Sequence, residues 1–102
     1  MTVTQLDSVI MLGVFFRDYV DAGTVEGRKR AEEALHAAVW PIAKAGDAAR
    51  LMGMETLIQR LKSTDGLRTR ARLAALDIVR EARADIYRTE QRKTHATAEV
   101  QQ

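Results

Sequence analysis

The chain has 102 residues, with no Cys, one Pro, six Gly and a formal net charge of +2. This length provides one modest core in a single domain, with no need for a disulfide or a structural metal. A composition of 46% hydrophobic and 29% charged residues excludes an intrinsically disordered chain and a membrane protein.

The first apolar run, Val9 to Phe16, is followed directly by Arg17 and Asp18. It lacks the basic start and the cleavage site of a secretory signal, and it is shorter than a membrane span. We therefore expect a soluble cytoplasmic protein that does not associate with a membrane. The richness in Ala and Arg favours a bacterial or phage source.

Every segment shows the spacing of a helix, which predicts an all-α fold, a small antiparallel bundle of about four helices. The first helix is expected to start with Thr4 as its N-cap and to end at Gly23. Its apolar positions at helical spacing are Leu6, Val9, Ile10, Gly13, Phe16 and Val20.

The second helix is expected to start at the N-cap Thr24 and to finish by Gly46, with a kink or an end near Trp40 because of Pro41. Its expected buried side comprises Ala31, Ala34, Leu35, Ala38, Val39 and Ile42. Asp47 is the expected N-cap of the third helix, whose apolar stripe comprises Leu51, Met54, Leu57, Ile58 and Leu61.

The fourth helix is predicted over about residues 66–93, after a turn at 63–66. Its apolar arc comprises Leu67, Ala71, Ala74, Ala75, Ile78, Ala82 and Ile86. At 1.5 Å per residue it reaches about 40 Å, more than the other helices can cover. We predict one domain over residues 1–94 and a disordered tail over 95–102.

The first helix is more apolar than one neighbouring helix requires, and a homodimer would bury the spare face. We predict a dimer interface that contains Ile10, Val14, Phe15 and Phe16.

The charge is unevenly distributed. Residues 1–26 carry one Arg and four carboxylates, a net charge of −3, whereas residues 66–94 carry eight basic and four acidic side chains, a net charge of +4. Arginines gather on one arc of the fourth helix and suit an acidic protein surface or a phosphate backbone. The predicted binding residues are Arg68, Arg72, Arg80, Arg83 and Tyr87. Leu76 and Tyr87 fall between Arg72, Arg80 and Arg83 on the arc. The alternative is a solvated face with local pairs such as Asp77 with Arg80.

The segment from Asp47 to Leu67 contains a small Ala49, a possible turn at Gly53 and the pair Gly66-Leu67. This arrangement resembles the core of the MerR-type and Fis-type helix-turn-helix segments, and the resemblance implies DNA binding. The regular stripe through Leu51 and Ile58 favours instead one uninterrupted helix.

Glu33 and His36 form a Glu-x-x-His motif of the kind found in di-iron bundles. A symmetric dimer with Glu55 or Glu81 would be needed to complete such a site. The pair Trp40-Pro41 could line a small pocket, although a lone Trp is more often a core or interface anchor. We expect no catalytic residue, no metal and no cofactor.

The sequence thus predicts a small non-enzymatic interaction or regulatory protein that binds another protein as a homodimer. The alternative is a nucleic-acid-binding regulator that uses the Arg face of the fourth helix, and a carboxylate and His metal site is a remote second alternative.

Overall fold

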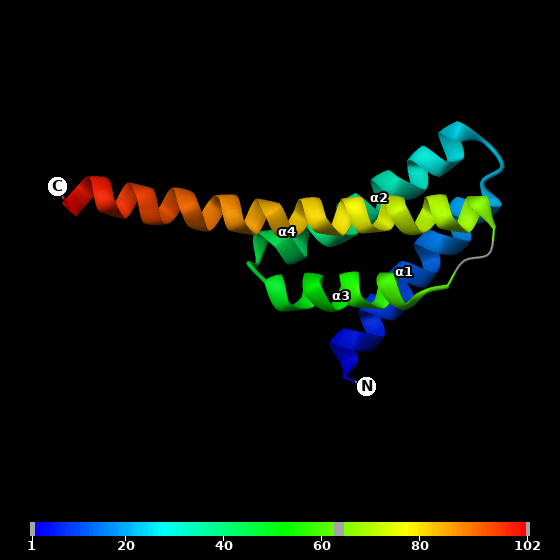
Figure 1. Cartoon of the computed structure of the whole chain (residues 1–102), viewed down its shortest axis with the longest axis horizontal. Helices are drawn as coiled ribbons and strands as arrows, with labels where there is room; N and C mark the ends of the chain where they lie inside the picture. The colour runs from blue at the N-terminus through cyan, green and yellow to red at the C-terminus, as the bar shows by residue number, and fades with distance from the viewer. Residues whose placement is uncertain (1, 63–64, 102) are drawn as a thin grey trace.

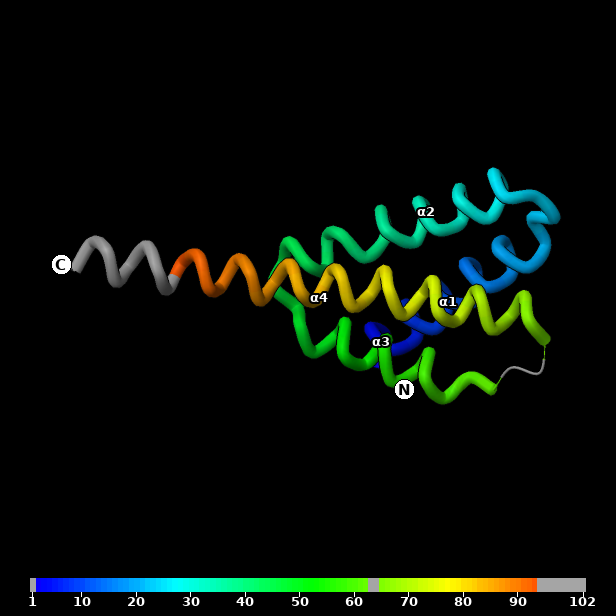
Figure 2. The backbone as a smooth tube through the Cα atoms, turned by 45° about the horizontal axis from the view of Figure 1, so that its top comes forward, coloured from blue at the N-terminus to red at the C-terminus, as the bar shows by residue number. Residues whose placement is uncertain are grey.

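The chain folds into four helices in its described part. The computed structural model describes the backbone of residues 2–62 and 65–101 and the side chains of residues 2–62 and 65–93. The helices are α1 (Val3–Asp21), α2 (Val25–Lys44), α3 (Ala48–Arg60) and α4 (Gly66–Gln101). Each helix runs opposite to the one before it, and α3 lies alongside α4 (Figures 1 and 2). The described part is all-helical, as the periodicity predicted. It is compact because α4 packs against all three other helices.

The ends of the helices follow their capping residues. The side chains of Thr24 and Asp47 accept hydrogen bonds from the backbone N–H groups of Gly27 and Arg50, at 3.0 Å and 3.1 Å, which confirms both predicted N-caps. Gly23 follows α1 with a φ of 68°, in the left-handed region that favours glycine. Gly46 follows α2 in the same way, with a φ of 71°.

The start of α1 differs from the prediction. Its N-cap is Thr2, whose side chain accepts from the N–H of Gln5, while the Gln5 side chain accepts from the N–H of Thr2. This reciprocal capping box satisfies two backbone donors, so it fixes the start of the helix two residues before Thr4.

The buried face of α1 also differs from the prediction. The buried residues are Ser8, Leu12, Phe15 and Tyr19, whereas Leu6 and Ile10 of the predicted stripe are 48% and 54% exposed. Apolar residues occupy most of the circumference of α1, so its periodicity fits more than one register. Ser8 and Tyr19 belong to the buried face, but both carry polar atoms. The apolar spacing therefore did not identify this face as the buried one.

The helix α2 continues through Pro41 to Lys44, so the helix does not end near Trp40. The kink at Pro41 stays a prediction. The buried face of α2 contains Ala31, Leu35, Val39, Ile42 and Ala43. Of the other two expected positions, Ala34 is exposed and Ala38 is half-buried.

The helix α3 runs without a break through Gly53. The helix-turn-helix interpretation is therefore wrong, because it required a turn at that glycine. Leu51, Met54 and Ile58 are fully buried, as their spacing predicted, whereas Leu61 lies just beyond the helix and is 45% exposed.

The helix α4 supplies the central face of the core. Its buried side chains are Ala71, Ala75, Leu76, Val79, Ala82 and Ile86. The orange part of α4 projects past the turn between α2 and α3 (Figure 2), in agreement with the expected overhang. The helix extends to Gln101, beyond the end predicted near residue 93. The tail predicted for 95–102 falls outside the residues whose side chains are described, and the Ser63–Gly66 turn is described only from Asp65. In the described part of the chain, no helix has the length and apolarity to cross a membrane.

Candidate interaction surfaces

Three of the four arginines predicted to bind a partner, Arg72, Arg80 and Arg83, lie at the border between α4 and α3. Leu76, which falls between Arg80 and Arg83 on the arc, is only 6% exposed. The arc therefore marks the edge of the buried face of α4, and its guanidinium groups can reach the neighbouring helix.

Arg72 caps the C-terminal end of α3. Its Nε donates to the carbonyl of Ile58 at 3.1 Å, and its Nη2 donates to the carbonyl of Gln59 at 2.9 Å. The last carbonyls of a helix have no partner within the helix and carry the negative end of its dipole. A cation at this place therefore stabilises the end of α3.

Arg80 and Arg83 hold a buried carboxylate. The Glu55 side chain is 8% exposed, and its Oε1 lies 3.2 Å from Nε of Arg80 and 3.0 Å from Nη2 of Arg83. Its Oε2 makes a 2.8 Å ion-pair contact with Nε of Arg83, at an angle that does not suit a hydrogen bond. The two arginines compensate a charge that would otherwise be costly to bury.

The prediction missed this role for Glu55, although the sequence contains a signal for it. Glu55 lies four residues after Leu51 and three before Ile58, in phase with the apolar stripe of α3. A carboxylate on the buried face of a helix needs a cation from a neighbouring element.

The remaining two predicted binding residues are exposed. Tyr87 is 64% exposed on α4, directly after the buried Ile86. Arg68 lies in the first turn of α4, where its Nε is 3.4 Å from Oδ2 of Asp65 and its side chain is 66% exposed. The predicted set therefore divides into three arginines that bind α3 and two residues that face solvent.

The predicted dimer residues divide in a similar way. Phe15 is 3% exposed and packs against Tyr19 in the core, which corrects its assignment to the dimer interface. Phe16 is half-buried, whereas Ile10 and Val14 are 54% and 43% exposed.

The residues of α1 outside the core form two further stripes, one exposed and one partly buried. We call the first the outward stripe, and it comprises Val3, Leu6, Ile10 and Val14, which are 77%, 48%, 54% and 43% exposed. At about 100° per residue, this stripe lies roughly opposite the buried face. The second is the groove stripe, and it comprises Val9, Gly13, Phe16 and Val20, about a quarter-turn from the buried face.

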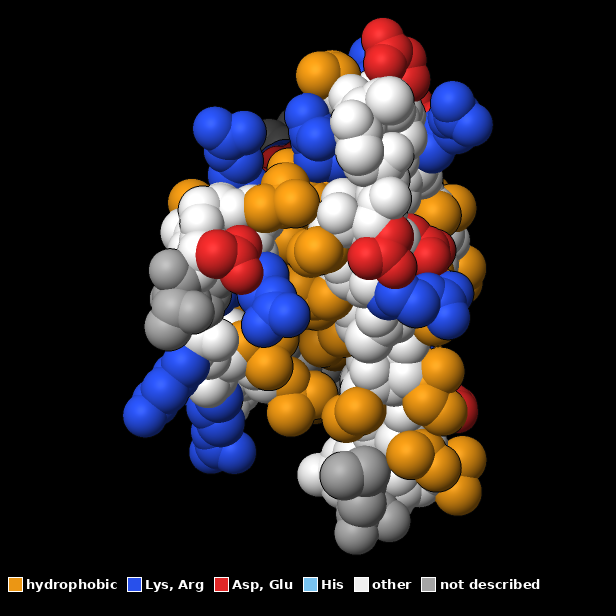
Figure 3. Space-filling view, turned by 90° about the vertical axis from the view of Figure 1, so that its right-hand side faces the viewer, with side chains coloured by type: hydrophobic (Ala, Val, Ile, Leu, Met, Phe, Trp, Pro, Cys, Tyr) orange, Lys and Arg blue, Asp and Glu red, His pale blue; other side chains and the backbone are white. Residues whose placement is uncertain are grey.

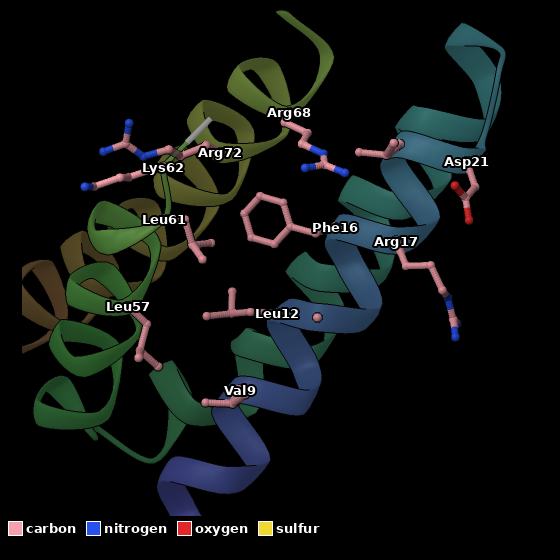
Figure 4. A pocket seen from close by; sticks show the side chains of 12 residues that line it. Val9, Leu12, Phe16, Arg17, Asp21, Leu57, Leu61, Lys62, Arg68 and Arg72 are labelled. Carbon is pink, nitrogen blue, oxygen red and sulfur yellow. The ribbon is translucent and has the colours of Figure 1, made fainter. Parts of the chain in front are cut away.

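The groove stripe forms one wall of an open groove with a volume of about 520 Å³. Leu57 and Leu61 of the α3 side form the opposite wall, and the ring of Phe16 projects between the walls (Figure 4). Apolar side chains line the hollow, and both basic and acidic side chains lie around it (Figure 3). Lys62, Arg68 and Arg72 form the cationic rim near the start of α4.

The proposed metal ligands on α2 are not brought together with others. Glu33 and His36 are exposed, and the His36 ring stacks on Trp40 with a centroid distance of 5.4 Å. Lys44 Nζ lies 4.8 Å from the centroid of the same Trp40 ring. Among the described side chains, no three His, Asp or Glu residues lie close enough to hold a metal ion.

Comparison with protein-family models, with curated proteins and with solved structures found no match to this chain.

Proposed function

We propose that this chain is a non-enzymatic helical interaction protein, which binds another protein and acts as a homodimer through the outward stripe of α1. The observation that carries the proposal is the exposure of four large aliphatic side chains on the face of α1 that points away from the core. Soluble proteins that act alone rarely expose a large contiguous apolar patch, and such patches mark interaction sites.

A second copy of the chain fits this stripe because the stripe is self-complementary. In an antiparallel pair centred on Ile10, Leu6 of each copy faces Val14 of the other copy, and the two Ile10 side chains meet. A parallel pair would place Arg17 against Arg17 and Asp21 against Asp21, and like charges at such positions are destabilising. The antiparallel arrangement also has the two-fold symmetry of the commonest dimers.

A protein partner agrees better with the geometry than a nucleic acid does. Phosphate binding needs cations that can release their counterions to a polyanion. Arg80 and Arg83 are already bound to Glu55, and Arg72 is bound to the end of α3. The arginine arc therefore offers less charge to a phosphate backbone than the sequence suggested.

Light scattering after size-exclusion chromatography, at several protein concentrations, tests the dimer. We expect the native chain to have twice the mass of one chain and Ile10→Glu to have the mass of one, because a charge cannot be buried in the stripe without a partner. Val25→Glu is the matched control, because Val25 is 67% exposed on α2 and receives the same change. Identical masses for Ile10→Glu and the native chain would contradict the proposal.

A further inference from the structure

The groove between α1 and the α3–α4 pair is a second apolar surface, separate from the outward stripe. Val9, Gly13, Phe16 and Val20 follow each other at intervals of four, three and four residues, the spacing by which one helix packs along another. From Val9 to Val20 the groove stripe is about 17 Å long, which corresponds to about three turns of a bound helix.

Gly13 provides room for close approach in the middle of this wall. A Cβ atom added to Gly13 would have no atom of the described chain within 4 Å, so the fold itself does not require a glycine there. A glycine inside a helix costs about 1 kcal/mol relative to alanine. A backbone that approaches α1 closely would account for the missing side chain.

The charged side chains around the groove favour one orientation of a bound helix. Arg68 lies at the end near Val20 with its guanidinium group toward the groove, whereas the charged ends of Lys62 and Arg72 point away from Phe16 on the α3 side (Figure 4). Arg17 and Asp21 point away from the groove on the far side of α1 (Figure 4). Acidic residues are most stable in the first turn of a helix, next to the positive end of its dipole. Arg68 therefore suits the N-terminal end of a bound helix with acidic residues in that turn.

We infer that the groove binds an amphipathic helix of a partner protein, antiparallel to α1. Its apolar anchors, spaced i, i+4, i+7 and i+11, would contact the groove stripe and Leu57, and carboxylates in its first turn would meet Arg68. This inference rests on the proposed role in protein interaction and specifies the partner, but it does not depend on the dimer. The outward stripe of a second copy fits less well, because α1 has no acidic residue in its first turn.

A labelled peptide tests the inference directly. The probe is a fluorescein-labelled helix of about 15 residues, with a Ser N-cap, two Glu residues in the first turn, Leu at the four anchor positions, and Ala and Gln elsewhere. Fluorescence anisotropy with the full chain should show saturable binding. A peptide of the same composition with its Leu positions scrambled should bind at least about tenfold more weakly, because its apolar side chains no longer share a face.

Two variants of the groove should each weaken binding by about tenfold or more. Gly13→Leu fills the open space in the α1 wall and also improves helix propensity, so the variant should fold at least as stably as the native chain. Leu61→Glu places a carboxylate beside the cationic rim. Ala34→Leu and Val25→Glu are the matched controls on α2, which contributes no residue to the groove, and they should leave the affinity unchanged.

The outcomes separate this inference from the proposed dimer. Ile10→Glu should change the mass and leave peptide binding intact, whereas Leu61→Glu should weaken peptide binding and leave the mass intact. The inference is wrong if the scrambled peptide binds as tightly as the designed one, or if Gly13→Leu and Leu61→Glu both bind like their controls. It is also wrong if Leu61→Glu dissociates the dimer, because the groove would then be the self-association site.

Discussion

Glu55 of α3 forms a buried ion pair with two arginines of α4. Removal of the arginines and removal of the carboxylate should therefore have unequal effects on the free energy of unfolding. The Glu55 side chain is 8% exposed in the native chain, and changing both Arg80 and Arg83 to Gln would remove the two charges opposite its carboxylate. Removal of one side of a buried ion pair costs about 3–5 kcal/mol. We expect a loss of this size in the free energy of unfolding.

The change Glu55→Leu should have a much smaller effect. The side chains of Arg80 and Arg83 are 50% and 42% exposed, so both guanidinium groups can turn to water when the carboxylate is removed. Leucine at this position would continue the buried stripe between Leu51 and Ile58. Replacement of a buried charge by an apolar residue is often neutral, so we expect a change within about 1 kcal/mol.

Urea denaturation followed by circular dichroism measures both changes. All variants are compared at one protein concentration, because the stability of a dimer depends on it. With a slope of about 2 kcal/mol per molar urea, the double arginine variant should lose roughly 1.5–2.5 M in its midpoint, and Glu55→Leu less than about 0.5 M. Arg88→Gln is the control, because Arg88 pairs with Glu81 at the surface, where such pairs contribute about 0–1 kcal/mol. Equal losses for Glu55→Leu and the double variant would refute this reasoning.

Three further predictions concern the glycines, Arg72 and nucleic acid. Gly53→Ala should raise the free energy of unfolding by about 1 kcal/mol, because Gly53 is exposed inside α3 with open space around it. Gly46→Ala should lower the free energy of unfolding by about 1–2 kcal/mol, because Gly46 has a φ of 71°. Thermal denaturation measures both, and a gain of stability in Gly46→Ala would contradict the argument. Arg72→Ala should lower the free energy of unfolding by about 1–2 kcal/mol. It should also speed amide hydrogen exchange in the last turn of α3, where the two carbonyl acceptors of Arg72 lie. Unchanged exchange there would show that these two hydrogen bonds contribute little to stability. In a gel-shift assay at low salt, the change of Arg68 and Arg83 to Gln should leave any binding of duplex DNA unaltered, and a steep loss that depends on salt would support the nucleic-acid alternative.

The sequence predicted the fold class and most helix boundaries, because these depend on local chemistry. Thr24 and Asp47 have side chains that cap a helix, and Gly46 can adopt a positive φ without strain, so each marks a boundary by its own properties. The start of α1 was misplaced by two residues because Thr2 and Thr4 are equally good N-caps, and the reciprocal bond with Gln5 decides between them.

The candidate surfaces were predicted less well, because they depend on how helices pack. Periodicity placed apolar residues all around α1, and only the position of α2, α3 and α4 determines which of them face the core. The spacing of Arg80 and Arg83 places them on one arc of α4, but their partner Glu55 is distant in sequence. No local rule shows that the two guanidinium groups reach across to α3.

Disulfide cross-linking tests the antiparallel homodimer most directly, since the chain has no cysteine of its own. In an antiparallel pair centred on Ile10, two copies of Ile10→Cys bring their sulfur atoms together, within the Cα separation of about 7 Å that a disulfide allows. The account predicts that oxidation yields a covalent dimer for Ile10→Cys, but not for Val3→Cys, which would face Arg17, nor for the control Val25→Cys on α2. No more cross-linking at Ile10 than at Val25 would contradict the dimer, and equal cross-linking at Ile10 and Val3 would contradict its antiparallel arrangement.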